Sequence, residues 1–248
     1  MHKPASVVPP ASFEEELEVF IVAVEEATQV FYTYLTIHRW LERHVDLVSL
    51  ANTHLMFFRT TLGSLRASTY IFIYKVFETR ADTFNLRRLM RALWYGMDEF
   101  GPEAFCARKV KGNFYNTPLW LKDRVNDMYV LTVPDVEKLE KVEEPWRNLF
   151  VTKFKDQRNK WYGHREFANE IDAGSKLPET TVEDVEKLLA YLNNLSRCLS
   201  QLYYNGTELD FELLRDPVIP TEPPSFQVRV KQATDDFFAK LLGHGFEK

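Results

Sequence analysis

The sequence contains few glycines and few cysteines. Of its 248 residues, 9 are Gly and 2 are Cys. It has neither a Gly-rich phosphate loop nor the Gly-x-Ser-x-Gly turn that presents a nucleophilic serine. Two cysteines, Cys106 and Cys198, are too few for a disulfide framework or a four-thiolate zinc site, so both are expected to be reduced thiols. The six histidines include no i, i+4 pair with a carboxylate, so we expect neither a metal nor a cofactor.

Long apolar runs and a strong net charge are also missing. No run approaches the ~18–20 apolar residues that span a bilayer, so no membrane contact is expected. Residues 1–12 are rich in Pro and Ala and lack the apolar core of a signal peptide, which predicts a flexible tail and a cytoplasmic protein. The net charge of −5 excludes a uniformly basic surface but allows a local basic patch.

Helical periodicity dominates what is present. Residues 13–77 contain no Pro and one Gly, and apolar residues recur every three or four positions from Phe13 to Leu35. This predicts a helix from Phe13 and a second long helix over about 48–77. Further helices are expected over 85–94, after Thr117-Pro118, after Val133-Pro134, from the capping box at Thr181 to Asn205-Gly206, and over about 225–242. Pro145 is expected to end or kink its helix, and 101–116 is the least regular stretch.

The predicted fold class is all-α: a long-helix bundle followed by a Pro-rich linker and a C-terminal helix. We expect a helical domain over residues 13–216. Residues 217–248 then hold the linker, with Pro217, Pro220, Pro223 and Pro224, and the terminal helix. The apolar residues of that helix need a surface, and a partner protomer is one candidate. They are Val228, Val230, Phe237, Phe238, Leu241 and Leu242.

Basic residues are concentrated between positions 147 and 165. Six basic residues and one acidic residue occur there, and residues 135–144, just before, hold five acids and two lysines. One interpretation is salt bridging between neighbouring helices. The other is an anion-binding face for phosphates, in which Trp161 and Tyr162 could stack on bases.

Within this patch, Arg158 and His164 combine the two groups that metal-free RNA cleavage requires. A base removes the proton of the ribose 2′-hydroxyl, and a cation stabilises the charge that builds on phosphorus. Six residues apart on an ideal helix, the two side chains lie about 120° apart, and a break at Gly163 would let them converge. Arg39 and His44 form a second such pair, but residues 39–44 contain no helix breaker, and we interpret them as a structural helix face with Arg39 and Arg43 as an i, i+4 pair.

The segment from Arg158 to His164 resembles the Arg-x(4–6)-His motif of the HEPN superfamily. Residues 74–86, YKVFETRADTFNL, are similar to a stretch of HEPN-like proteins of the abortive-infection group, and the resemblance covers about residues 13–204. It implies a two-fold dimer whose two motifs line one cleft and cut RNA without metal, leaving a 2′,3′-cyclic phosphate. Arg158 would then stabilise the phosphate, His164 would act as base or acid, and Asn159 would orient the backbone.

The RNA-binding residues expected beside this site are Lys153, Lys155, Lys160, Tyr162 and Arg165. The expected partners are RNA, with tRNA as one candidate, a second copy of the chain, and a separate antitoxin protein. The function predicted is a ribonuclease that serves as a toxin or phage-defence effector. The alternatives are a non-catalytic module that binds RNA, nucleotide or a partner protein, and a structural protein whose patch pairs with residues 135–144.

Overall fold

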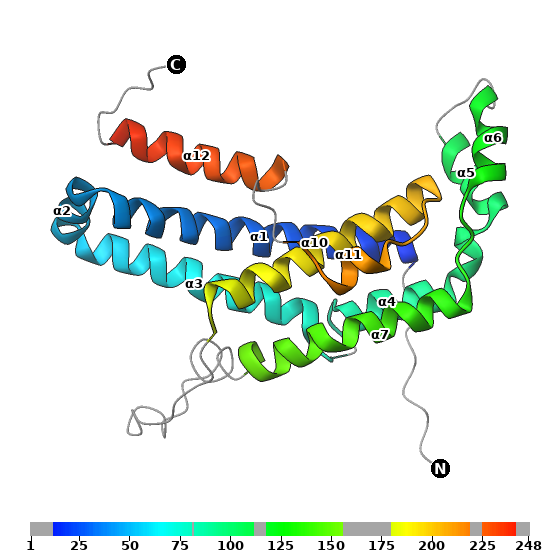
Figure 1. The fold of residues 1–248 in the computed structure, drawn as a ribbon, viewed down its shortest axis with the longest axis horizontal. Helices are drawn as coiled ribbons and strands as arrows, with labels where there is room; N and C mark the ends of the chain where they lie inside the picture. The colour runs from blue at the N-terminus through cyan, green and yellow to red at the C-terminus, as the bar shows by residue number, and fades with distance from the viewer. Residues whose placement is uncertain (1–11, 81, 112–117, 156–179, 219–224, 242–248) are drawn as a thin grey trace, which may run out of the picture. The chain divides into compact units, whose positions relative to one another are not determined.

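The computed structural model describes residues 12–80, 82–111, 118–155, 180–218 and 225–241, with the backbone alone for 225–231 and 241. All regular structure in these ranges is helical, without a strand, so the predicted all-α class is confirmed (Figure 1). A 3₁₀ turn covers Met97–Phe100, and a π-helix covers Phe150–Phe154. The α-helices are α1 (Phe13–Arg43), α2 (Val45–Thr53), α3 (Leu55–Phe77), α4 (Leu86–Tyr95), α5 (Pro102–Val110), α6 (Leu119–Asp127), α7 (Val133–Leu149), α10 (Val182–Asn205), α11 (Phe211–Arg215) and α12 (Ser225–Leu241).

The chain forms two compact units, each assembled from three separate segments. The first unit comprises residues 1–22, 76–148 and 191–217, and the second comprises 23–75, 149–190 and 218–248. Four of the five boundaries fall inside helices, namely α1, α3, α7 and α10, and neither unit is continuous in sequence. The division into a domain over 13–216 and a separate C-terminal part stays a prediction.

Reciprocal side-chain caps define the starts of α1 and α10, and a glycine ends α10. Ser12 N–H donates to Glu15 Oε2 at 3.1 Å, and Glu15 N–H donates to Ser12 Oγ at 3.3 Å. Thr181 and Asp184 form the same reciprocal pair, at 2.9 and 3.1 Å. At the other end of α10, Gly206 takes φ +59°, which only glycine adopts without strain. The predicted starts of α1 and α10, and the end of α10, are confirmed.

The single helix predicted over about 48–77 is wrong, because a break at His54 divides this stretch between α2 and α3. A break at His44, where φ −126° and ψ 104° are extended, ends α1 at Arg43 and separates it from α2. The short α2 turns back so that its buried Leu47 packs with Ile37 and Phe238.

The structure corrects two further expectations. The stretch at 101–116 is not uniformly irregular, because α5 starts at Pro102, a residue suited to the first turn of a helix. Of the two outcomes expected at Pro145, an end of the helix is wrong, because α7 continues to Leu149. The next residue, Trp146, stacks on Tyr191 at 4.9 Å and donates its indole N–H to the Leu214 carbonyl at 3.1 Å. These contacts hold the helix through the proline.

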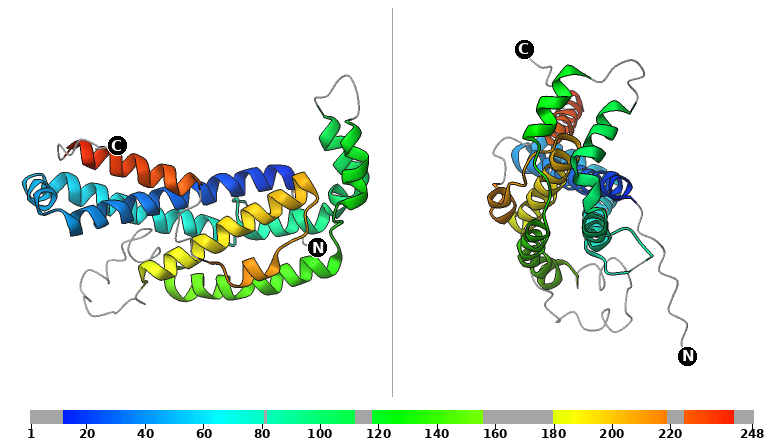
Figure 2. Two further views of the ribbon diagram at one scale, coloured as in Figure 1. Left: turned by 45° about the horizontal axis from the view of Figure 1, so that its top comes forward. Right: turned by 90° about the vertical axis from the view of Figure 1, so that its right-hand side faces the viewer.

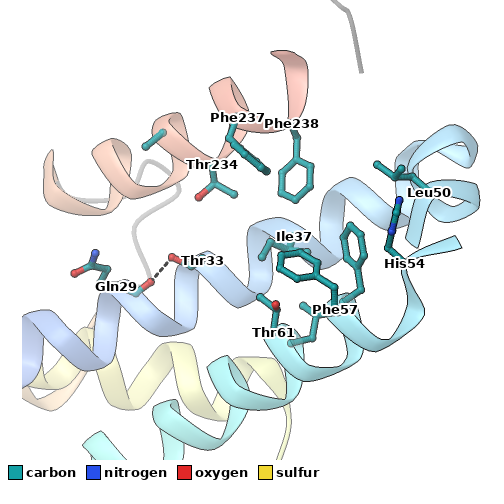
Figure 3. A pocket seen from close by; sticks show the side chains of 13 residues that line it. Gln29, Thr33, Ile37, Leu50, His54, Phe57, Thr61, Thr234, Phe237 and Phe238 are labelled. Carbon is teal, nitrogen blue, oxygen red and sulfur yellow. Dashed lines mark hydrogen bonds between the residues drawn. The ribbon is translucent and has the colours of Figure 1, made fainter. Parts of the chain in front are cut away.

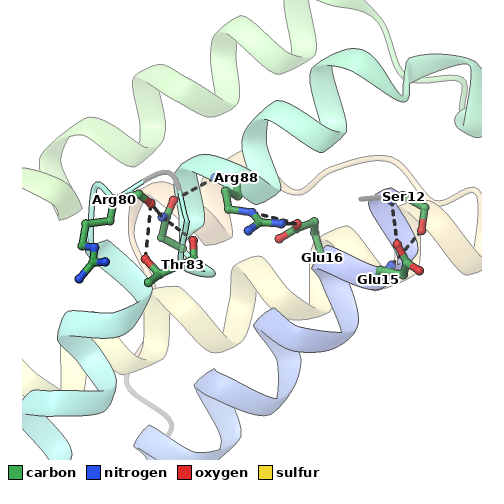
Figure 4. A network of polar contacts seen from close by, with 7 residues as sticks. Ser12, Glu15, Glu16, Arg80, Thr83 and Arg88 are labelled. Carbon is green, nitrogen blue, oxygen red and sulfur yellow. Dashed lines mark hydrogen bonds and ion pairs between the residues drawn. The ribbon is translucent and has the colours of Figure 1, made fainter. Parts of the chain in front are cut away.

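The core of the first unit combines an aromatic cluster with a buried ion pair. Phe13 packs on Phe100 at 4.9 Å and on Tyr203 at 5.2 Å between ring centroids. Arg88, on α4, donates from Nε to Glu16 Oε1 at 3.1 Å, and the Glu16 side chain is only 5% exposed (Figure 4). The pair fixes α4 against the start of α1.

In the second unit, α12 lies alongside the later part of α1 (Figure 1, Figure 2). Phe238 is 4% exposed and packs in one cluster with Ile37 and Leu47. Trp40 donates its indole N–H to Asp235 Oδ1 at 2.6 Å. Phe238, one of the residues for which a partner protomer was a candidate surface, is therefore buried against its own chain.

Truncating Phe238 is expected to release α12. Phe238→Ala should accelerate amide hydrogen exchange in residues 232–240 about 100-fold, which corresponds to roughly 3 kcal/mol for a lost core aromatic ring. Phe237 is 60% exposed, so Phe237→Ala should change exchange less than about fivefold. Equal exchange rates in the two variants would mean that Phe238 does not anchor α12.

Candidate functional site

The structure describes two of the eight predicted site residues, Lys153 and Lys155. The other six lie outside the described residues, so their convergence stays a prediction. They are Arg158, Asn159, Lys160, Tyr162, His164 and Arg165. What can be built from the residues upward is the framework on both sides of this segment.

A π-helix leads into the motif. It covers Phe150–Phe154 and ends four residues before Arg158. Its two phenylalanines are buried and pack on α3: the ring centroids of Phe154 and Tyr70 are 5.8 Å apart, as are those of Phe150 and Tyr74. π-Helical turns are rare and frequently occur at functional sites. Here the turn fixes the approach to the motif on one face of α3.

The residues that follow the motif segment contact Lys153, which precedes it. Thr180 donates from Oγ1 to the Lys153 carbonyl at 2.8 Å. Lys153 Nζ also lies 3.7 Å from Asp184 Oδ2 in the first turn of α10. Lys153 and Thr180, which lie on either side of the segment 156–179, are therefore held together in the second unit.

The described part of the basic patch is partly neutralised. Arg147 pairs with Glu143 at 2.6 Å, four residues earlier in the same helix α7, so this pair does not join neighbouring helices. Lys153 pairs with Asp184 in the first turn of α10, outside the acidic stretch 135–144. Lys155 is exposed. Of these three basic residues, Lys153 alone fits salt bridging between neighbouring helices, whereas Lys155 presents its charge to solvent directly before the motif.

A small polar pocket of about 200 Å³ borders this framework, and its lining includes Tyr34 of α1, Arg66 and Tyr70 of α3, and Thr180. Burial raises the pKa of Tyr70, and hydrogen bonds from Thr180 and Arg66 oppose this shift. No local pattern in the sequence marks Arg66, Tyr70 or Tyr34 as pocket residues. Arg66 and Tyr70 are four positions apart on α3, and this spacing is visible in the sequence, but nothing local places α3 beside Thr180.

A larger, apolar pocket of about 860 Å³ lies in the second unit among α1, α2, α3 and α12 (Figure 3). Phe57, Phe58, Phe237 and Phe238 contribute to its lining, and its described lining contains no Lys, Arg, Asp or Glu. Such a lining does not suit the phosphates of RNA. His54 is exposed at this pocket, whereas His38 on α1 is half-buried and burial lowers its pKa.

Among the described residues, no group of three His, Cys, Asp or Glu is placed to hold a metal ion. No helix in the described ranges is both long and apolar enough to cross a membrane. Both cysteines are free thiols, and burial raises the pKa of Cys198.

The sequence matches a family model over most of its length. The family model HEPN_AbiU2, described as AbiU2, matches residues 13–219. The chain belongs to this family, which confirms the resemblance to abortive-infection HEPN proteins. No curated protein and no solved structure matches the chain.

Proposed function

We propose that this protein is a metal-independent endoribonuclease of HEPN type that acts as a toxin or phage-defence effector. The observation that carries the proposal is the family match over residues 13–219, which includes the Arg158-to-His164 segment. Family membership alone does not define an activity, because one fold hosts many functions. The chemistry therefore rests on the residue types in the segment.

In this mechanism His164 removes the proton of a ribose 2′-hydroxyl, and the 2′-oxygen attacks the adjacent phosphorus. Arg158 stabilises the negative charge on the non-bridging oxygens, and Asn159 orients the backbone of the RNA. The bond to the 5′-oxygen breaks, and the leaving oxygen takes a proton from the His164 of a second protomer. The products are a 2′,3′-cyclic phosphate and a 5′-hydroxyl, and no metal takes part.

RNA would reach this site over a basic surface. Lys155 is exposed immediately before the motif, which supports its role as a phosphate contact. Lys153, Lys160, Tyr162 and Arg165 would complete the surface, and tRNA is one candidate substrate. We propose a homodimer, and a separate antitoxin protein as the partner that restrains the enzyme.

The test is incubation of the purified protein with total tRNA in excess EDTA. Discrete RNA fragments are the expected result, together with a dimer mass by analytical ultracentrifugation. RNA that is bound but never cut would instead favour the non-catalytic binding module. Cleavage that appears only after Mg²⁺ is added would overturn the mechanism, and a monomer would overturn the two-protomer site.

A further inference from the structure

A cationic pocket, separate from the segment that holds Arg158 and His164, lies where α1 ends and α2 begins. It has a volume of about 240 Å³ and is lined by Thr36, Arg39, Trp40, Arg43, His44 and Asp235. The break at His44 creates it, because an unbroken helix would carry that side chain around the axis, away from Arg39. The expectation that no break precedes His44 is therefore wrong, whereas Arg39 and Arg43 do share one helix, α1.

The wall of this pocket is fixed by contacts within the second unit. Trp40 donates its indole N–H to Asp235 Oδ1 at 2.6 Å. His44 stacks on Trp40 with ring centroids 4.4 Å apart and an interplanar angle of 20°. Phe238 also stacks on Trp40, with ring centroids 5.9 Å apart. Trp40 already stacks with two rings, so the pocket offers positioned cations rather than an aromatic platform for a base.

Both guanidinium groups at the pocket are weakly engaged. Arg39 and Arg43 lie one helical turn apart on α1, which places them on the same face. The nearest carboxylate to Arg39 is that of Glu186, at 3.9 Å, and the Arg39 side chain is 45% exposed. Arg43 is exposed and forms no ion pair within 4.0 Å in the described part of the chain. Both charges are available to a ligand.

The charge and the volume of the pocket indicate which phosphate group it fits. The two guanidinium groups face one lining carboxylate, Asp235, whose Oδ1 is already occupied by the indole N–H of Trp40, and Glu186 lies 3.9 Å from Arg39 outside the lining. Because these carboxylates offset part of the charge of the two guanidinium groups, the pocket suits the single negative charge of a phosphodiester better than the dianion of a phosphate monoester. The volume is below the ~300–1,000 Å³ of pockets that hold drug-sized ligands, so a whole nucleotide does not fit.

We propose that Arg39, Arg43 and His44 bind one backbone phosphodiester of an RNA strand, at a contact separate from Arg158 and His164. Guanidinium groups suit this role because their planar forks donate two parallel hydrogen bonds to phosphate oxygens. The contact is independent of base sequence and extends the RNA path beyond the motif. The inference rests on the proposed function only in taking RNA as the ligand.

The test measures binding of a single-stranded RNA oligonucleotide to the His164→Ala protein, which leaves the RNA uncut, over a range of KCl concentrations. Arg43→Gln in this background should weaken binding about 5–10-fold at ~0.1 M salt and make the log–log salt dependence shallower by about 0.7. Arg39→Gln should behave alike. Arg59→Gln is the matched control, since Arg59 is an exposed arginine on α3 outside this pocket, and it should change affinity less than twofold.

Affinity and salt dependence of Arg43→Gln equal to those of Arg59→Gln would overturn the inference, as would a parent protein that does not bind RNA. Failure here is distinguishable from failure of the proposed function. Wild-type cleavage with an Arg43→Gln protein that binds like the control removes this contact and leaves the nuclease. Weaker, less salt-dependent binding by Arg43→Gln without any wild-type cleavage supports the contact and counts against the nuclease.

Discussion

His164→Ala is expected to lower the rate of RNA cleavage by about 10³-fold or more, with a melting temperature within about 2 °C of the wild type. A positioned general acid or base contributes roughly 10²–10⁴-fold, and in the proposed dimer the same substitution removes both the base and the acid. Arg158→Ala should lower the rate about 10²–10³-fold, because it removes the cation that stabilises the phosphorane. Single-turnover cleavage of a labelled oligonucleotide measures both effects.

The matched control is His54→Ala. His54 is an exposed histidine between α2 and α3, and it lies outside both the proposed catalytic site and the proposed phosphodiester contact. Its removal should leave the cleavage rate within about twofold of the wild type. A His164→Ala protein that folds and still cleaves at more than a tenth of the wild-type rate would rule out His164 as the catalytic base.

Arg88→Ala is expected to lower the free energy of unfolding of the first unit by about 3–5 kcal/mol. The Glu16 carboxylate is 5% exposed and accepts hydrogen bonds from Arg88 Nε at 3.1 Å and Nη2 at 2.5 Å. Removing the arginine leaves a buried charge without its partner, which costs far more than the pair itself contributes. Urea denaturation monitored by circular dichroism measures the change.

Two variants separate this effect from the loss of any arginine. Arg80 pairs with Asp82 at 2.7 Å, but both side chains are about two-thirds exposed, so Arg80→Ala should leave the free energy of unfolding nearly unchanged. The double variant Glu16→Leu/Arg88→Met should regain much of the loss, because it removes both charges. An Arg88→Ala protein as stable as Arg80→Ala would show that the pair does not hold α4 to α1.

Local signals in the sequence were sufficient for the fold class and for several helix ends. The apolar residues of α1 that recur every three or four positions are buried, apart from the half-buried Ile21, because a 3.6-residue period places them on one face, whereas Val19 and Val22 lie off this face and are exposed. The capping residues Ser12 and Thr181 and the terminating Gly206 act within a few residues of themselves. Such short-range chemistry is visible without any tertiary structure.

The sequence did not predict features that long-range packing decides. The breaks at His44 and His54 depend on α2 turning back so that Leu47 meets Phe238, almost 200 positions further along the chain. Pro145 stays within α7 although proline disfavours a helix interior, since the adjacent Trp146 is held by Tyr191 and Leu214.

The same contrast between short-range signals and long-range packing applies to the candidate site. Arg158 and His164 are recognised by a local motif, and the family match covers them. Arg66 and Tyr70 line a pocket beside the motif segment only because the structure places α3 next to Thr180, which no local signal predicts. Arg43 lacked a signal of its own, because its role depends on the break at His44 and on Asp235 from α12.

The chemistry of the RNA ends produced in EDTA tests the central claim most directly. The wild-type protein should leave a 2′,3′-cyclic phosphate on the upstream fragment and a 5′-hydroxyl on the downstream fragment, as attack by the 2′-oxygen requires. Treatment with an enzyme that opens cyclic phosphates, followed by mass spectrometry, identifies these ends. Fragments that carry 3′-hydroxyl and 5′-phosphate ends would show that water attacks instead and would contradict the roles proposed for Arg158 and His164.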